Sequence, residues 1–157
     1  MTDSKNNQRN SATATAWQFT EQVPHSRDLG MQIISITKNQ ACIRLPPNPL
    51  LFVDDNTEEF CASVLYSLAD SASGLAVLAE ARDSSPIATL DLRVDYFQPA
   101  KGDRALLAVA TCPKLTEEVA FIHCDIFHEG CHELLATANA TFMRNTLGGR
   151  ILANERA

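Results

Sequence analysis

The stretch FCASVLYSLADSASGLAVLAEA, from Phe60 to Ala81, is the longest periodic segment in this 157-residue chain and contains no proline. Its larger apolar residues recur at three- and four-residue spacing, which predicts an amphipathic helix. The preceding residues 54–57 (DDNT) are candidate N-caps, and the two glutamates that follow suit a helix N-terminus. Small residues cover much of the remaining helix surface, so we expect the helix to be buried.

Segments on both sides of this helix have the character of β-strands. Upstream, MQIISIT (31–37) and ACIRL (41–45) flank a polar turn and predict a hairpin. Downstream, apolar and polar residues alternate over 88–98, and three further strands are predicted over 106–112, 119–127 and 133–143. The order predicts an α+β domain in which an antiparallel sheet packs on one long helix, although other α+β meanders fit the same pattern.

Length and composition indicate a single domain. The chain is 45% hydrophobic and 20% charged, close to the average for globular proteins. We expect a disordered leader over 1–15, a folded domain over 16–145 and a tail over 146–157. A formal net charge of −6 argues against a nucleic-acid partner, because a binding protein must neutralise phosphates.

The cysteines and the hydropathy pattern bear on location. Five cysteines without paired spacing favour a reducing, cytoplasmic setting over a disulfide scaffold. The first ten residues lack the apolar core of a secretory signal. A membrane span needs roughly 20 apolar residues in a row, and we interpret no segment of the sequence as such a span. We therefore expect no membrane partner.

Asp70, in the middle of the predicted helix, is the first candidate functional residue. Burying a carboxylate costs several kcal/mol unless it is paired or hydrogen-bonded, and aspartate is a poor helix former. One interpretation places Asp70 in a solvated groove or against a neighbouring serine. The other makes it a general base or nucleophile in a partly apolar pocket.

Three segments carry a resemblance to a known family: VLYSLADSASGLAVLAE (64–80), ATLDLRVDYFQPAKGD (88–103) and ATANATFM (136–143). Together they resemble the PaaI-like, or phenylacetate-degradation, branch of the hotdog-fold thioesterases, over about residues 29–143. The resemblance implies a hotdog fold, an antiparallel sheet wrapped around one long central helix. It also implies hydrolysis of a small acyl- or aryl-CoA thioester, no metal or other cofactor, and a homodimer or homotetramer.

The resemblance also assigns roles to individual residues. Asp70 falls on the catalytic acid, contributed by the partner subunit, and Thr89 on a residue that holds the attacking water. The family's His-Gly-Gly is replaced by residues 61–63, so the N–H that polarises the thioester carbonyl would come from Ala62. The Cβ atoms at positions 62 and 63 narrow the approach that glycine leaves open. The candidate substrate contacts are Asn56, Cys61, Ser63 and Lys101, the last of these being equally interpretable as a solvated turn charge.

Several alternatives remain open from the sequence. FCAS (60–63) also resembles the Phe-Gly-Gly-Ser of the YiiD C-terminal branch of hotdog thioesterases. The missing His-Gly-Gly favours a non-catalytic module that binds acyl-CoA or another apolar ligand, whereas the presence of both Asp70 and Thr89 favours an enzyme. Cys61 at a helix start is an alternative nucleophile. HEGCH (128–132) matches a zinc-protease pattern, but Gly130 between two β-like runs predicts a hairpin turn instead.

Overall fold

The computed structural model describes residues 23–54, 56–82 and 85–146. One antiparallel six-stranded sheet contains, in spatial order, β1 (Gln32–Ile36), β2 (Gln40–Leu45), β4 (Leu106–Leu115), β5 (Val119–His128), β6 (Leu134–Arg144) and β3 (Ile87–Tyr96). The predicted hairpin and all four downstream strands are confirmed. The expected leader and nearly all of the expected tail lie outside the described residues, so the domain limits at 16 and 145 stay predictions.

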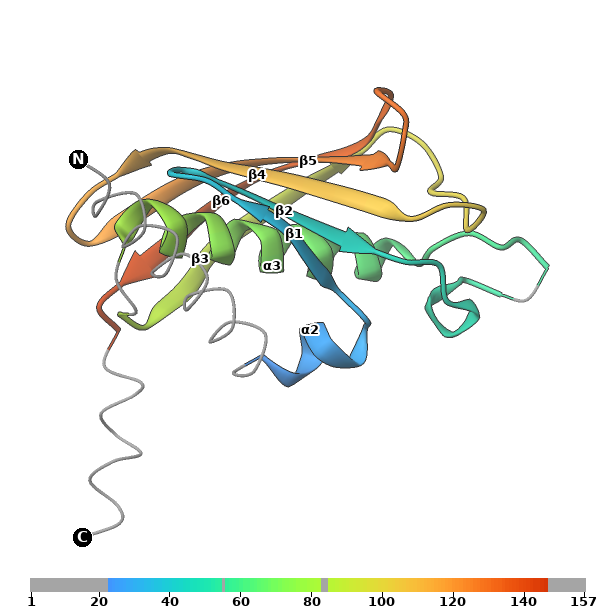
Figure 1. Cartoon of the computed structure of the whole chain (residues 1–157), viewed down its shortest axis with the longest axis horizontal. Coiled ribbons are helices and arrows are strands. Elements are labelled where there is room, and N and C mark those ends of the chain that lie inside the picture. The colour runs from blue at the N-terminus through green and yellow to red at the C-terminus, as the bar shows by residue number, and fades with distance from the viewer. Residues whose placement is uncertain (1–22, 55, 83–84, 147–157) are drawn as a thin grey trace, which may run out of the picture.

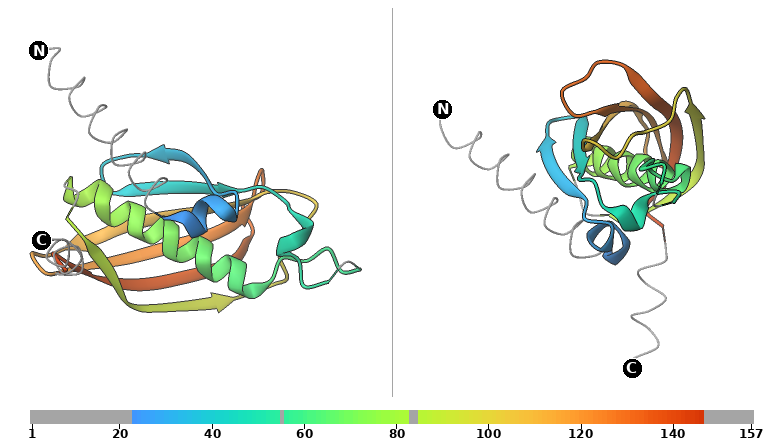
Figure 2. Two further views of the ribbon diagram at one scale, coloured as in Figure 1. Left: turned by 90° about the horizontal axis from the view of Figure 1, so that it is seen from below. Right: turned by 90° about the vertical axis from the view of Figure 1, so that its right-hand side faces the viewer.

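The long helix α3 (Ala62–Ala81) lies along the concave side of the curved sheet (Figures 1 and 2). Its buried side chains pack on a sheet face that is rich in alanine, and these small side chains let the helix approach closely. The principal contributors from the helix are Leu65, Leu68, Ala72, Leu75 and Ala76, and those from the sheet are Ala108, Ala110, Ala136, Ala138 and Ile126. The expected sheet wrapped around one central helix, the hotdog arrangement, is confirmed.

The start of α3 differs from the prediction. The helix begins at Ala62, with Cys61 as its N-cap, and the candidates at 54–57 do not cap it. Asp54 instead closes a turn of its own, because its Oδ1 accepts the backbone N–H groups of Asn56 and Thr57, both at 2.8 Å. Phe60 is extended and forms a β-bridge with Phe52.

A short helix that the sequence did not predict, α2 (Pro24–Asp28), contacts the side of α3 that faces away from the sheet (Figure 1). The Ser26 and Ser71 hydroxyls lie 3.1 Å apart in a buried contact, and His25 Nε2 lies 3.3 Å from Ser67 Oγ. Proline at the first helical position favours this helix, although five residues give little periodicity to detect.

By length and composition α3 would also suit a membrane span, contrary to the sequence interpretation. Its leucine, valine and alanine content outweighs its two charged residues, Asp70 and Glu80. Most of this helix is buried against the sheet, however, as expected for the core helix of a folded domain. The apolar composition of α3 therefore reflects its place in the core.

Candidate active site

Asp70 and Thr89 meet where the middle of α3 crosses the beginning of β3. The Thr89 hydroxyl donates a hydrogen bond to Asp70 Oδ1 at 2.8 Å. Asp70 is half-buried and lies on the helix face opposite the core, beside the exposed residues Ser63 and Tyr66. Because the Thr89 hydrogen is directed at Oδ1, Asp70 Oδ2 is the oxygen suited to accept a proton from water. The two residues assigned by resemblance are thus in direct contact.

The N-terminus of α3 presents backbone N–H groups. Cys61 makes no side-chain cap, and its carbonyl accepts the Val64 N–H at 2.9 Å. The N–H groups of Ala62 and Ser63, in the first turn, have no intrahelical carbonyl to bind. Both residues are exposed, and the positive end of the helix dipole favours a negatively charged oxygen here. Ala62, the predicted donor, therefore lies exposed in the first turn of the helix, and its role as a donor stays a prediction.

Ala62 and Asp70 of the same chain are far apart. Eight residues separate them, which at 1.5 Å per residue is about 12 Å along the helix axis. The donor N–H, the carbonyl group, the attacking water and the carboxylate together span about 10 Å, and only when all of their contacts are in line. Within one chain, the helix N-terminus and the carboxylate would therefore reach the same carbonyl group only in an almost fully extended arrangement.

The chain's two tyrosines connect α3 to β3 between these positions. The Tyr96 hydroxyl donates to the Ala62 carbonyl at 3.1 Å, and the Tyr66 hydroxyl donates to the Leu92 carbonyl at 3.3 Å. Burial raises the pKa of the Tyr96 phenol, with Tyr66 adding to the effect, so Tyr96 remains a donor at neutral pH. Sequence reasoning missed both contacts, although the alternation of β3 places Tyr96 on the same face as Leu92 and Val94.

The candidate substrate contacts lie at the start of the helix (Cys61 and Ser63), in the loop before it (Asn56) and in the loop after β3 (Lys101). Asn56 is exposed in the turn closed by Asp54, and Cys61 is half-buried at the N-cap. Lys101 forms an ion pair with Glu59, and the Lys101 N–H donates to His128 Nε2 at 3.2 Å. Glu59 thus partly neutralises the charge of Lys101, one of the candidate substrate contacts.

HEGCH is a turn between two strands, as predicted. His128 is the last residue of β5, Gly130 has a φ of 81°, and the Cys131 N–H donates to the His128 carbonyl at 3.0 Å. The glutamate of the motif pairs with Arg44 at 2.8 Å. Across residues 23–54, 56–82 and 85–146, no group of three or more His, Cys, Asp or Glu side chains is arranged to hold a metal ion.

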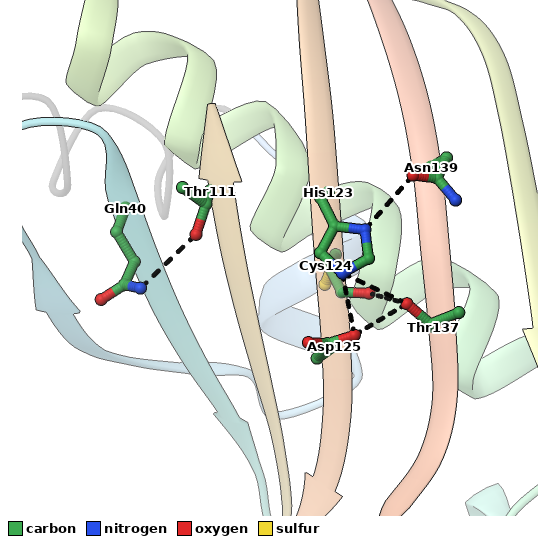
Figure 3. A network of polar contacts seen from close by, with 7 residues as sticks. All are labelled: Gln40, Thr111, His123, Cys124, Asp125, Thr137 and Asn139. Carbon is green, nitrogen blue, oxygen red and sulfur yellow. Dashed lines mark hydrogen bonds and ion pairs between the residues drawn. The ribbon is translucent and has the colours of Figure 1, made fainter. Parts of the chain in front are cut away.

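A polar network lies on the opposite, outer face of the sheet (Figure 3). His123 Nδ1 lies 3.2 Å from Asn139 Oδ1, its Nε2 lies 3.1 Å from Asp125 Oδ1, and the Thr137 hydroxyl donates to Asp125 at 2.7 Å. His123 is exposed while its strand neighbours Ile122 and Cys124 are buried against the helix side. His123 is therefore separated from Asp70 by the sheet itself.

The chain resembles known thioesterases in sequence. The family model described as "Thioesterase superfamily" matches residues 62–135, which contain α3, β3, β4 and β5. The chain is 27% identical over 138 residues to the Escherichia coli protein named "Medium/long-chain acyl-CoA thioesterase YigI", covering 80% of this chain and 88% of that one.

Two solved structures show the same fold. The E. coli PaaI protein from the phenylacetic acid degradation operon superposes with a TM-score of 0.76 at 18% identity, covering 86% of this chain and 94% of that one. A thioesterase family protein from Silicibacter pomeroyi superposes with a TM-score of 0.74 at 19% identity, covering 85% of this chain and 97% of that one. Over residues 62–135 the chain therefore resembles the thioesterase superfamily, and it shares the hotdog fold of these solved structures.

Proposed function

We propose that the protein is an acyl-CoA thioesterase in which Asp70 is the general base. The observation that carries this proposal is the 2.8 Å contact between Asp70 and Thr89 on the open face of α3. A half-buried carboxylate that is hydrogen-bonded through one oxygen suits proton removal from water at the other. The family match and the thioesterase name of the E. coli relative support the same reaction class.

The proposed site requires two copies of the chain. β3 is an edge strand, and large apolar side chains are exposed along it and at its end, including Leu90 at 52% and Phe97 at 58%. Such an edge is suited to pairing with a second strand. An antiparallel partner would cover the edge and the open face of α3 together, giving the expected homodimer or a tetramer built from it.

The spacing of the contacts favours one geometry for this dimer. Tyr66 lies midway between Ala62 and Asp70, and its hydroxyl contacts Leu92, which lies between Thr89 and Tyr96 on β3. A two-fold axis passing near Tyr66 and Leu92 therefore brings Asp70 opposite the partner's Ala62. The distance of about 12 Å within one chain is then closed between two chains.

The proposed reaction uses these groups in order. Asp70 Oδ2 takes a proton from water, whose oxygen attacks the thioester carbon. Thr89 already donates its hydrogen to Asp70, so it meets that water only as an acceptor. The carbonyl oxygen becomes an oxyanion facing the N–H of the partner's Ala62. When the intermediate collapses, the C–S bond breaks, the electron pair leaves with the CoA sulfur, and the sulfur takes up the proton.

The remaining candidate residues are proposed to contact the substrate. The Ser63 N–H is next to that of Ala62, while Asn56 and Cys61 border the helix start from the preceding loop. Lys101 would meet a CoA phosphate by exchanging its partner Glu59 for the ligand. A small acyl- or aryl-CoA is the expected substrate, and the name of the E. coli relative adds medium and long chains to those worth testing.

The proposed location is the cytoplasm. All five cysteines are free thiols, and burial raises the pKa of the Cys42, Cys112 and Cys124 thiols. Free thiols suit a reducing compartment such as the cytoplasm.

Asp70→Asn is the direct test. Asparagine keeps the shape and can still accept the Thr89 hydrogen bond, but it cannot take a proton, so thiol release from acyl-CoA should fall at least about a hundredfold. Asp95→Asn is the matched control, since Asp95 pairs with Arg93 on the outer face of the same strand at 2.9 Å. Purified wild type and both variants are assayed against short, medium, long and aryl acyl-CoAs. Unchanged turnover in Asp70→Asn would remove Asp70 from the mechanism.

A binding module without turnover is the second candidate function. It is favoured by the Cβ atoms at Ala62 and Ser63, where the family pattern has two glycines and an open approach to the helix. Acyl-CoA binding measured by calorimetry, with no thiol release across the panel, would establish this function instead.

A further inference from the structure

We propose that Tyr96 is a positioning residue that orients and polarises the backbone donors at the start of α3. Its hydroxyl donates to the carbonyl of Ala62 at 3.1 Å, and that carbonyl belongs to the same peptide group as the Ser63 N–H. This inference rests on the proposed function, because it assumes that a substrate carbonyl binds at the helix N-terminus.

The contact lies at the point of α3 where a side chain can influence an oxyanion donor. A peptide group whose carbonyl accepts an extra hydrogen bond becomes more polarised, and its N–H becomes a better donor. Tyr96 thus strengthens the Ser63 N–H directly. It also restrains residue 62 from outside the helix, and so limits the movement of the adjoining peptide group, which carries the Ala62 N–H. The two N–H groups together form a two-donor site.

The Tyr96 hydrogen bond compensates for a missing cap and missing glycines at the start of α3. Cys61 provides no side-chain cap, and alanine and serine stand where the family pattern has glycines. The first turn of a helix frays unless its end is held. In this chain Tyr96, the last residue of β3, restrains the first turn of α3. The strand that would form the dimer edge therefore also fixes the geometry of the backbone donors.

Tyr66 provides a matched contact elsewhere on the same two elements. Its phenol also donates to a backbone carbonyl across the α3–β3 boundary, at 3.3 Å, and its side chain is exposed to nearly the same extent, 44% against 46% for Tyr96. The acceptor, however, is Leu92 in the strand and not a residue of the helix N-terminus. Removing either hydroxyl therefore takes one equivalent hydrogen bond from the fold, but only one of them acts on the donors.

The test compares Tyr96→Phe with Tyr66→Phe in two measurements on the full chain. The first is binding of two unreactive acyl-CoA analogues: a ketone, in which a methylene replaces the sulfur, and a thioether, in which a methylene replaces the carbonyl. Their affinity ratio reports the carbonyl site alone. Tyr96→Phe should lower the preference for the ketone about fivefold to tenfold, and Tyr66→Phe should change it less than about twofold.

The second measurement is turnover of the best acyl-CoA substrate. Tyr96→Phe should lower kcat by about the same factor with KM nearly unchanged, because the donor acts mainly on the developing oxyanion. Equal losses in the two variants would reduce Tyr96 to a brace between helix and strand and overturn the inference. So would a wild-type protein that binds both analogues equally or neither of them.

The two proposals fail separately. If Asp70→Asn leaves turnover intact, or if the wild type releases no thiol, the proposed mechanism fails. The ketone preference of wild type and Tyr96→Phe still decides the role of Tyr96 in either case, since that measurement needs no hydrolysis.

Discussion

Gly102 offers a test of how the loop before α3 is held in place. An added Cβ at this position would overlap Phe52 Cζ and would lie 2.7 Å from Phe52 Cε1 and 2.8 Å from the Glu58 carbonyl oxygen. The Gly102 N–H also donates to that same oxygen at 2.6 Å. Gly102 is not among the glycines with positive φ, so alanine is excluded by its contacts and not by backbone conformation.

The loss of stability in Gly102→Ala depends on which of these neighbours can move. The Phe52 ring can rotate, but it packs edge-to-face on Phe60 with centroids 5.2 Å apart, and the Glu58 oxygen is backbone. Overpacking of this kind costs about 1–3 kcal/mol, and the backbone contact places Gly102→Ala in the upper half of that range. For a domain of this size the melting temperature should fall by about 4–10 °C.

The assay is thermal unfolding followed by circular dichroism, with Gly130→Ala as the control. Within the described part of the chain, Gly130 has no neighbour within 4 Å of an added Cβ but has a φ of 81°, so alanine there meets backbone strain without a clash. Adding Phe52→Leu to Gly102→Ala should recover only part of the loss, because Glu58 remains. A Gly102→Ala protein that melts within about 2 °C of wild type would refute the reasoning.

Three further predictions concern single side chains. Thr89→Val should lower kcat about tenfold by releasing the Asp70 carboxylate, whereas Thr89→Ser should retain most activity in the same thiol-release assay. Ser73→Ala should leave stability unchanged or raise it by up to about 1 kcal/mol in urea unfolding, because the Ser73 hydroxyl is fully buried and has no hydrogen-bond partner among the described residues. Partial burial lowers the pKa of His128 below the usual value of about 6.5. The unfolded chain then binds the proton more readily, so stability should fall as pH drops below about 6.5, and His128→Gln, titrated by urea unfolding between pH 7 and 5, should flatten that fall.

The strands could be predicted because each is long enough to show its alternation. All four downstream strands lie within three residues of their expected limits. The helix end at Ala81 was also correct, but its start was not. Residues 54–57 have the composition of an N-cap, and a single sequence does not reveal that Asp54 binds the two N–H groups just ahead of it. Local propensity alone cannot choose between a cap and a turn.

Part of the candidate site could also be predicted from the sequence, and part could not. The resemblance pointed to Asp70 and Thr89, and the structure brings them into hydrogen-bond contact. The tyrosine contacts could not be found in this way, because Tyr96 and Ala62 are 34 residues apart in the chain. Their meeting depends on the register of β3 against α3, which is set by packing of the whole sheet and not by any local motif.

Under the proposed function, that register would also let the site tolerate an altered helix start. Three contacts align α3 with β3 at positions 62, 66 and 70, spaced four residues apart on one helix face. Backbone donors need only the correct position and direction, and any residue except proline supplies an N–H. If β3 fixes residue 62 from outside, the side chains at 61–63 are free to differ from His-Gly-Gly while the donors stay in place. Such a change would alter the space above the donors. It would therefore affect which acyl groups fit the site more than it affects the reaction.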